Sequence, residues 1–254
     1  MDVFCFDFDG VVCDSAPETA VTAWKGCREL WPEIGAELPL ALQERFCRLR
    51  PVLHTGFEAV PLMRLIEQGR HSDEELLERF PQLLDELIER ERLTSGRLKE
   101  LFGGIRDVLI GADQALWLEW NRFYPGIGEA LTAAIAGHPV FIVTTKQERF
   151  VSLLLDHHRI DLPPERIFGL ERNRTKPEIL AELMARPEWN GATFHLIEDR
   201  LDTLMHVIAD PALEDVRLYL ADWGYNTPRQ REEAAALPRI EVVSVEAFRR
   251  LHGL

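Results

Sequence analysis

Basic residues are scarce in this sequence relative to acidic ones. Its 254 residues include 29 lysines and arginines against 43 aspartates and glutamates, which gives a formal net charge of −14 at pH 7. Such a charge repels the phosphate backbone of nucleic acids and anionic lipid head groups, and no cluster of basic residues offsets it locally. We therefore expect neither a nucleic acid nor a membrane surface as a partner.

Long apolar runs and a basic leader are also missing. Residues 1–7, MDVFCFD, already contain two carboxylates, which an uninterrupted secretory segment would not tolerate. Further along the chain, we find no apolar run of the length needed to cross a bilayer. These two features predict a cytoplasmic protein.

Cysteine is sparse and confined to the first fifth of the chain. The four cysteines are Cys5, Cys13, Cys27 and Cys47. They form no CxxC pair and have no histidine at a spacing typical of zinc sites. We expect free, buried thiols in a reducing compartment rather than disulfides or a zinc centre.

Short runs of β-branched and aromatic residues, bounded by turn residues, recur along the chain. They lie at Val3–Phe8, Val140–Thr144, Ile167–Leu170, Phe194–Ile197, Val216–Ala221 and Ile240–Val243. Helical stretches separate most of these runs, and the runs are apolar nearly throughout, as in parallel strands that helices cover on both faces. The sequence therefore predicts an α/β fold with a Rossmann-like, doubly wound and mainly parallel sheet.

The alternation of strands and helices is interrupted between residues 16 and 123, where the apolar spacing is helical. Within this stretch, Ser72 precedes the acidic residues 73–75 as an expected helix N-cap, and leucines at three- to four-residue spacing follow. We predict a core domain made of residues 1–15 and 124–254, with an inserted all-helical cap domain at residues 16–123.

The strongest functional signal is DFDGVVCDS at residues 7–15, directly after the first predicted strand. Asp7 and Asp9 stand two residues apart where the strand ends, and Gly10 permits the chain to turn there. Binding sites of open α/β sheets lie at the carboxyl ends of their strands. Two acids at this edge can share one cation while doing different chemistry, although acids also occur at strand ends without any function.

Two further elements place polar groups at positions of the same kind. Thr144 and Thr145 end the second predicted strand, and Lys176 opens a helix with Pro177 in its first turn. A threonine there is commonly only a strand end or a helix cap. A lysine at a helix start opposes the helix dipole, so that a functional role for it requires a nearby anion.

The last element is the acidic pair Glu198-Asp199, which follows the predicted strand at residues 194–197. Magnesium prefers oxygen ligands and commonly takes one or two protein carboxylates. Asp199 is the best candidate ligand of this pair. Asp202, three residues later, is either a further ligand or a supporting or helix-capping residue.

In this order, the four elements resemble the motifs of the haloacid dehalogenase superfamily, whose first motif reads DxDGxxxD. The resemblance implies that Asp7 is a nucleophile and that Asp9 is a general acid and base. It also implies that the Asp7 side chain and the Asp9 backbone carbonyl hold Mg2+ together with Asp199, while Glu198 holds a metal-bound water. Dehalogenases of the family lack the second acid, so Asp9 favours phosphoryl transfer.

The other motif residues receive substrate-directed roles from the same resemblance. Thr144 would donate a hydrogen bond to a phosphoryl oxygen, with Gly10 and Thr145 as further contacts. Lys176 would neutralise the nucleophile and the transferred phosphoryl group. The implied function is a magnesium-dependent phosphatase for a small phosphorylated metabolite, such as phosphoglycolate or a sugar phosphate. A phosphomutase and a catalytically silent binding protein are the alternatives.

A polar break between predicted helices, RLRPVLHTG at residues 48–56, stands out within the insertion. Loops of this kind often carry specificity. We expect Arg50, and with less support Arg48 and His54, to contact the part of the substrate that does not react. An ordinary solvated turn between helices is the equally weighted alternative.

Overall fold

A computed structural model describes residues 1–253 of the chain. It divides the protein into two compact units. Met1–Asp14 and Phe123–Leu254 form the first, which we call the core unit, and Ser15–Arg122 form the second, which we call the insertion unit. Each unit is described by itself below.

Within the described residues, a six-stranded sheet organises the core unit, with the strand order β5-β4-β1-β6-β7-β8. Every pairing in it is parallel. The strands are β1 (Asp2–Phe6), β4 (Val140–Val143), β5 (Ile167–Phe168), β6 (Thr193–Glu198), β7 (Arg217–Ala221) and β8 (Ile240–Val243). The predicted α/β class is confirmed, and each predicted apolar run overlaps a strand.

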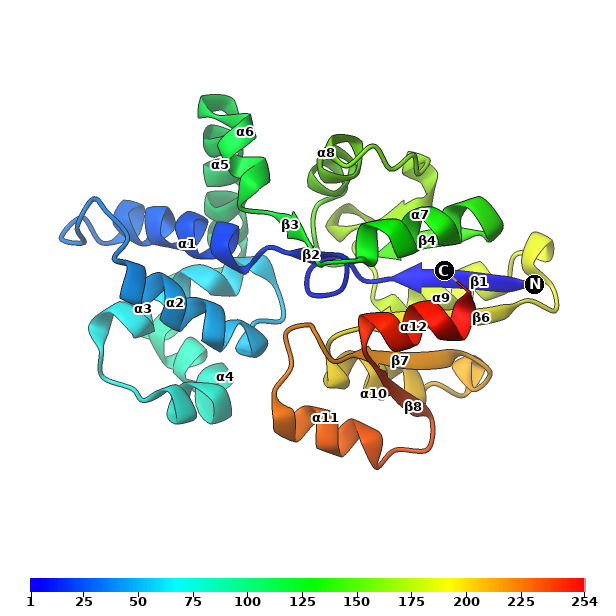
Figure 1. The fold of residues 1–254 in the computed structure, drawn as a ribbon. Helices are drawn as coiled ribbons and strands as arrows, with labels where there is room; N and C mark the ends of the chain where they lie inside the picture. Colours follow the sequence, from blue (N-terminus) through cyan, green and yellow to red (C-terminus); the bar gives the residue numbers. More distant parts are fainter. Residues whose placement is uncertain (254) are drawn as a thin grey trace. The chain divides into compact units, whose positions relative to one another are not determined.

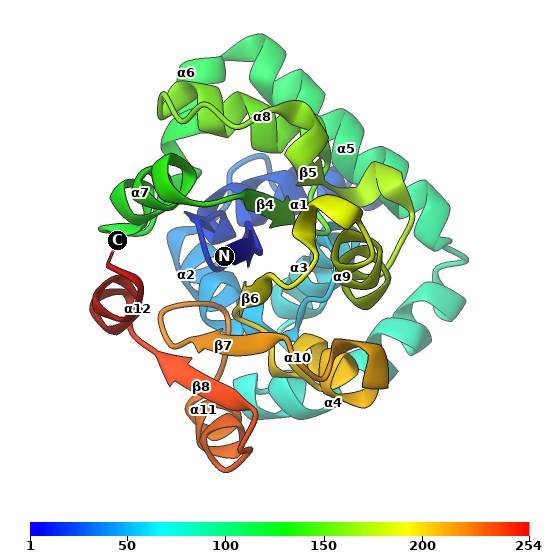
Figure 2. The same ribbon diagram turned by 90° about the vertical axis from the view of Figure 1, so that its right-hand side faces the viewer.

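Helices cover both faces of this sheet (Figures 1 and 2). Val3 and Cys5 of β1 belong to an apolar cluster with residues of α9 and α10, whereas Phe4 and Phe6 meet the Phe248 ring of α12 edge-on. Alternate residues of one strand therefore enter opposite layers, which explains why the strand is apolar throughout. The core-unit helices are α7 (Ile127–Gly137), α8 (Glu148–His157), α9 (Lys176–Met184), α10 (Leu201–Ala209), α11 (Pro228–Ala235) and α12 (Val245–His252).

The insertion unit is built from helices, as its apolar spacing predicts. They are α1 (Ala16–Leu30), α2 (Leu40–Leu49), α3 (Ala59–Gln68), α4 (Asp73–Arg90), α5 (Ser95–Ala112) and α6 (Gln114–Glu119). The predicted N-cap is confirmed, because the Ser72 side chain accepts a hydrogen bond from the Glu75 N–H at the start of α4. Apolar residues of α1 to α5 form a core of their own.

Short elements complete the fold. Two strands, β2 (Cys13–Asp14) and β3 (Arg122–Phe123), form a second small sheet, which the sequence did not indicate. Single 3-10 turns lie at η1 (Arg50–Val52), η2 (Gly56–Glu58), η3 (Pro164–Arg166), η4 (Leu170–Arg172), η5 (Pro187–Trp189) and η6 (Pro211–Leu213). Within residues 1–253, none of the helices combines the length and the apolar character that crossing a membrane requires.

Candidate active site

The candidate site lies where three adjacent strands of the core unit end. β1 pairs with β4 on one side and with β6 on the other. Asp7 follows β1 directly, Thr144 follows β4, and Glu198 is the last residue of β6. The backbone N–H of Asp7 donates to the Ile197 carbonyl at 2.9 Å, which fixes the start of the loop. All these groups thus reach one edge of the sheet.

Lys176 joins two of the carboxylates at this edge. Its Nζ lies 2.8 Å from Asp7 Oδ1 and 2.5 Å from Glu198 Oε2. Burial alone would lower the pKa of Lys176, but the charges of Asp7 and Glu198 outweigh it and hold this pKa above its ordinary value. The anion that a lysine at a helix start requires is therefore present, and the ammonium stays protonated at neutral pH.

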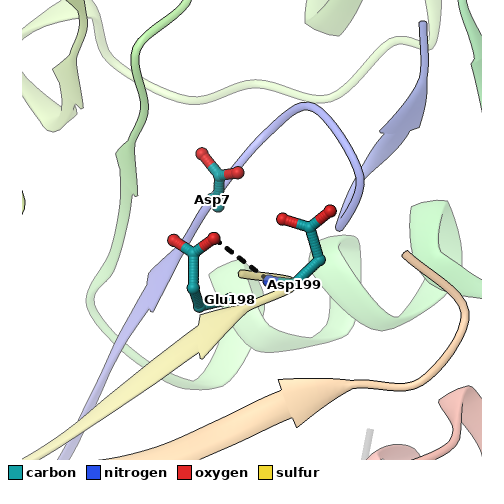
Figure 3. Close-up of side chains that lie close together, drawn as sticks. All are labelled: Asp7, Glu198 and Asp199. Atoms are coloured by element: carbon teal, nitrogen blue, oxygen red, sulfur yellow. Dashed lines mark hydrogen bonds between the residues drawn. The ribbon is translucent and has the colours of Figure 1, made fainter. Parts of the chain in front are cut away.

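Asp7, Glu198 and Asp199 form a buried carboxylate cluster, in which one ligand atom from each lies within 4.8 Å of the others. Figure 3 shows the three side chains at the ends of β1 and β6. Desolvation by burial raises the pKa of Asp7 to about 6, that of Asp199 to about 6 and that of Glu198 to about 7. One ammonium does not balance three such carboxylates, so the cluster is suited to a further cation.

The oxygens of the cluster fit Mg2+. Asp199 Oδ2 accepts a hydrogen bond from the Tyr225 N–H at 2.6 Å, but the buried Asp199 Oδ1 has no hydrogen-bond partner among residues 1–253. Glu198 Oε1 instead accepts the backbone N–H groups of Asp199 and Arg200 at 3.1 Å and 3.0 Å. Asp7 and Asp199 can therefore ligate a hard cation, whereas Glu198 is held by neighbours and suits a supporting position.

Two glycines leave the space in which Asp199 sits. Gly10 has a φ of +92°, and a Cβ at this position would overlap the Asp199 carboxylate. A Cβ at Gly224 would overlap both Asp199 and the carbonyl oxygen of Gly10. Gly10 was predicted as a substrate contact. The structure explains in another way why a glycine is needed here, because the first loop passes too close to Asp199 for a side chain at position 10.

The loop after β7 holds Asp199 and the first loop in place, and this role was not predicted from the sequence. Besides the Tyr225 N–H bond, the Asn226 side-chain amide donates to the Asp199 carbonyl at 2.9 Å. The Tyr225 hydroxyl donates to Asp14 Oδ1 at 2.9 Å, and the Trp223 indole N–H donates to the Val11 carbonyl at 3.0 Å. The only available signal was the sequence DWGYN at the carboxyl end of another parallel strand.

Asp9 has a different partner from Asp7. Its Oδ1 lies 2.9 Å from the Nζ of Lys146, whose side chain is fully buried. The structure does not include the Asp9 carboxylate in the cluster of Asp7, Glu198 and Asp199. Lys146 was missed, although it follows Thr144 and Thr145 directly and therefore belongs to the same strand end.

The two predicted threonines have different surroundings. Thr144 is buried, its N–H donates to the Phe168 carbonyl at 2.9 Å, and its Oγ1 accepts the N–H of Lys146 at 3.2 Å. Thr145 is exposed and lines a pocket of about 270 Å3 next to Thr144 and Thr175. Thr144 is therefore a fixed hydroxyl at the edge of the sheet, and Thr145 faces open space beside it.

Comparison with known proteins decides the family. Residues 1–205 match the family model described as haloacid dehalogenase-like hydrolase. The chain belongs to this family. No curated protein matches the chain in sequence.

Solved structures of similar fold cover nearly the whole of this hydrolase. A predicted phosphatase from Clostridium acetobutylicum is 16% identical, with a TM-score of 0.61 over 100% of this chain and 99% of that chain. A predicted phosphoglycolate phosphatase from Haemophilus somnus is 14% identical, with a TM-score of 0.61 over 98% and 97%. A haloacid dehalogenase-like family hydrolase from Streptococcus pneumoniae is 13% identical, with a TM-score of 0.58 over 99% and 97%. At sequence identities this low, the comparison with these structures shows only that the fold is similar.

Asp202 of the hydrolase lies in the first turn of α10. Its two carboxylate oxygens accept hydrogen bonds from the Arg200 guanidinium, each at 3.1 Å. Asp202 is not part of the carboxylate cluster of Asp7, Glu198 and Asp199. Of the two roles considered from the sequence, the geometry favours the supporting one.

The predicted specificity residues Arg48, Arg50 and His54 lie in the insertion unit, around the end of α2 and η1. Arg50 is buried, with 9% of its surface exposed, and donates to the Leu53 carbonyl at 3.3 Å. Arg48 pairs with Asp73 at 3.5 Å, and the His54 N–H donates to Glu58 at 2.6 Å. The break between helices is therefore an ordered segment with a 3-10 turn, and contact of these residues with a substrate stays a prediction.

Proposed function

We propose that this hydrolase is a magnesium-dependent phosphatase that cleaves phosphomonoesters of small metabolites through an aspartyl phosphate on Asp7. The observation that carries the proposal is the contact of Lys176 with both Asp7 and Glu198, beside the buried oxygen of Asp199 that lacks a partner. A phosphomonoester dianion resists attack by a carboxylate because both are negative. One fixed ammonium beside the nucleophile, with a carboxylate pair suited to a divalent cation, offsets this repulsion.

In the proposed first step, an Asp7 oxygen attacks phosphorus in line with the leaving oxygen. Lys176 keeps its proton and stabilises the charge on the transferred group, and Thr144 donates its hydroxyl hydrogen to a phosphoryl oxygen. Asp9 gives its proton to the departing alkoxide. Asp7, Asp199 and the Asp9 carbonyl would hold Mg2+, with Glu198 in support, and the bound ion would supply further positive charge to offset that of the phosphoryl group.

In the second step, the phosphoryl group passes from Asp7 to water. The Asp9 carboxylate takes a proton from the attacking water, and the bond between phosphorus and the Asp7 oxygen breaks, which restores both acids to their starting states. We propose that the insertion unit acts as a cap that excludes bulk water from the first step. The likeness in fold to a predicted phosphoglycolate phosphatase supports phosphoglycolate or a sugar phosphate as first substrates to test.

Magnesium dependence is the first prediction. With a set of phosphorylated metabolites at neutral pH, excess chelator is expected to abolish phosphate release, and added Mg2+ to restore it. Asp199→Ala should lose Mg2+ binding in a calorimetric titration as well as activity, because it removes a buried carboxylate oxygen of the cluster that has no hydrogen-bond partner within residues 1–253. Asp202→Ala is the matched control, since Asp202 lies three residues away and pairs with Arg200.

We expect Asp202→Ala to reduce Mg2+ affinity much less than Asp199→Ala. Full activity in excess chelator, or equal Mg2+ affinity in wild type and Asp199→Ala, would contradict the metal assignment. Analysis of the products in the same assay separates the phosphatase from the phosphomutase alternative. A phosphatase releases inorganic phosphate, whereas a mutase returns the phosphoryl group to another position of the sugar.

The proposed specificity role of Arg50 gives a second prediction. Arg50→Ala should raise KM for the metabolite substrate by roughly tenfold or more, the effect of losing one charged hydrogen bond. It should leave KM for p-nitrophenyl phosphate nearly unchanged, because that substrate lacks the polar groups of the metabolite that Arg50 is proposed to contact. Arg79→Ala is the control, because Arg79 is another arginine of the insertion unit, pairs with Glu75 and has 54% of its side chain exposed. Equal effects of Arg50→Ala on both substrates would indicate damage to the insertion unit instead.

A further inference from the structure

Lys146 is the second lysine at the carboxyl edge of the sheet, and the proposed mechanism gives it no role. It follows β4, two residues after Thr144, and 0% of its side chain is exposed. Its backbone is fixed on both sides, because its N–H donates to Thr144 Oγ1 at 3.2 Å and its carbonyl accepts the Leu170 N–H at 3.0 Å. The backbone from which the Lys146 side chain extends is therefore held in place.

Burying an ammonium is costly unless an anion compensates it. The Lys146 Nζ lies 2.9 Å from Asp9 Oδ1, and 17% of the Asp9 side chain is exposed. The same Nζ lies 6.0 Å from the centre of the Phe8 ring, which limits where the stem can move. The pair thus joins a fully buried ammonium, that of Lys146, to a carboxylate that is still partly exposed, that of Asp9.

The two aspartates of the first motif therefore have separate lysine partners. Lys176 contacts Asp7, and Lys146 contacts Asp9. The two lysines come from different segments of the core unit, because Lys146 follows β4 and Lys176 begins α9.

We propose that Lys146 is a positioning residue for Asp9, holding the carboxyl group that exchanges a proton with the leaving oxygen and then with water. This inference rests on the proposed function. In the first step, the proton of the Asp9 carboxyl moves to the leaving oxygen as the phosphorus–oxygen bond breaks, and the carboxylate formed stays paired with Lys146. In the second step, that carboxylate takes a proton from water. Lys146 keeps its own proton throughout.

This geometry predicts that Lys146→Met makes the first chemical step more sensitive to the leaving group. The measurement is a rapid-quench burst with a series of aryl and alkyl phosphates whose leaving groups differ in basicity. A misplaced acid can slow a step by about 10²-fold, so we expect a loss of that order for the most basic leaving groups. The loss with p-nitrophenyl phosphate should be within about threefold, because its phenolate departs without a proton.

A double-variant cycle with Asp9→Asn distinguishes positioning of Asp9 from direct contact with the phosphoryl group. If Lys146 acts through Asp9, adding Lys146→Met to Asp9→Asn should change the burst rates little. Lys146→Arg keeps the charge but moves the donor, and we expect it to recover part of the rate for basic leaving groups. Circular dichroism and thermal unfolding of each variant report whether the fold is intact.

The inference would be overturned if Lys146→Met slowed the first step equally for all leaving groups, or if its effect were fully additive with that of Asp9→Asn. Lys146 would then act on the phosphoryl group instead. A different result tests the proposed function itself. Wild-type protein with Mg2+ that hydrolyses no phosphomonoester of the series, p-nitrophenyl phosphate included, is not a phosphatase. The two failures are therefore separate.

Discussion

Asp7→Asn is expected to abolish hydrolysis of every phosphomonoester, whatever its leaving group. A nucleophile is needed for each substrate, and an amide oxygen neither forms a stable acyl phosphate nor carries the charge that Lys176 neutralises. Asparagine has nearly the shape of aspartate, and the Asp7 N–H bond to the Ile197 carbonyl does not involve the side chain. The variant should therefore fold. Rapid acid quench with radiolabelled substrate should trap labelled protein from the wild type and none from Asp7→Asn.

Asp2→Asn is a matched control for Asp7→Asn, since Asp2 begins the same strand at its opposite end. It pairs with His195 there, and 46% of its side chain is exposed. We expect Asp2→Asn to keep the wild-type rate. Asp9→Asn should behave differently from both, losing about 10²–10⁴-fold in the first step with alkyl phosphates and much less with p-nitrophenyl phosphate. Measurable turnover by Asp7→Asn with any substrate would exclude Asp7 as the nucleophile.

The fold was predictable because its signals are local. Each strand of the parallel sheet is enclosed on both faces, so that it reads as an apolar run, and the Ser72 cap with its acidic first turn marked the start of α4. The end of β1 was less predictable. Phe8 is as apolar as the strand before it, but the Val12 and Cys13 N–H groups both donate to its carbonyl, which places it in the turn instead.

The site residues that belong to a known motif were predictable from the sequence. The residues of a distant loop that hold them in place were not. Asp7, Lys176 and Glu198 were expected near one another, and they are in contact. The hydrogen bond from the Tyr225 N–H to Asp199 joins residues 26 positions apart, and no spacing in the sequence indicates it. Lys146 was missed for another reason. A lysine three residues after the end of a strand usually faces solvent, but the side chain of Lys146 is fully buried.

The insertion unit has a buried ion pair of its own, whose loss is expected to destabilise it strongly. The Arg106 guanidinium of α5 donates to both oxygens of Glu18 in α1, at 2.5–3.1 Å, and Glu18 is fully buried. Thr22 and the Trp117 indole donate to the same carboxylate at 2.6 Å and 3.2 Å. The carboxylate therefore joins the first helix of the unit to its last two, α5 and α6.

Arg106→Met should lower the free energy of unfolding of the insertion unit by about 3–5 kcal/mol, because it takes the guanidinium away from the buried Glu18 charge. Amide hydrogen exchange measures the effect within the unit, and we expect α1 and α5 to lose protection while β1 keeps it. Arg79→Met is the control for removing an arginine from an ion pair, since Arg79 pairs with Glu75 at 3.0 Å with 54% of its side chain exposed. Exposed pairs of this kind contribute about 0.2–1 kcal/mol.

The double variant Glu18→Met/Arg106→Met decides whether the charge left behind causes the loss. Removing both partners takes away the buried carboxylate together with its counter-ion, and apolar replacements of similar volume are often neutral or even stabilising. We therefore expect the double variant to be more stable than Arg106→Met alone. If the double variant is less stable than the single one, the Glu18 carboxylate stabilises the unit even without the guanidinium, through its hydrogen bonds from Thr22 and Trp117, and the buried charge is not the cause of the loss.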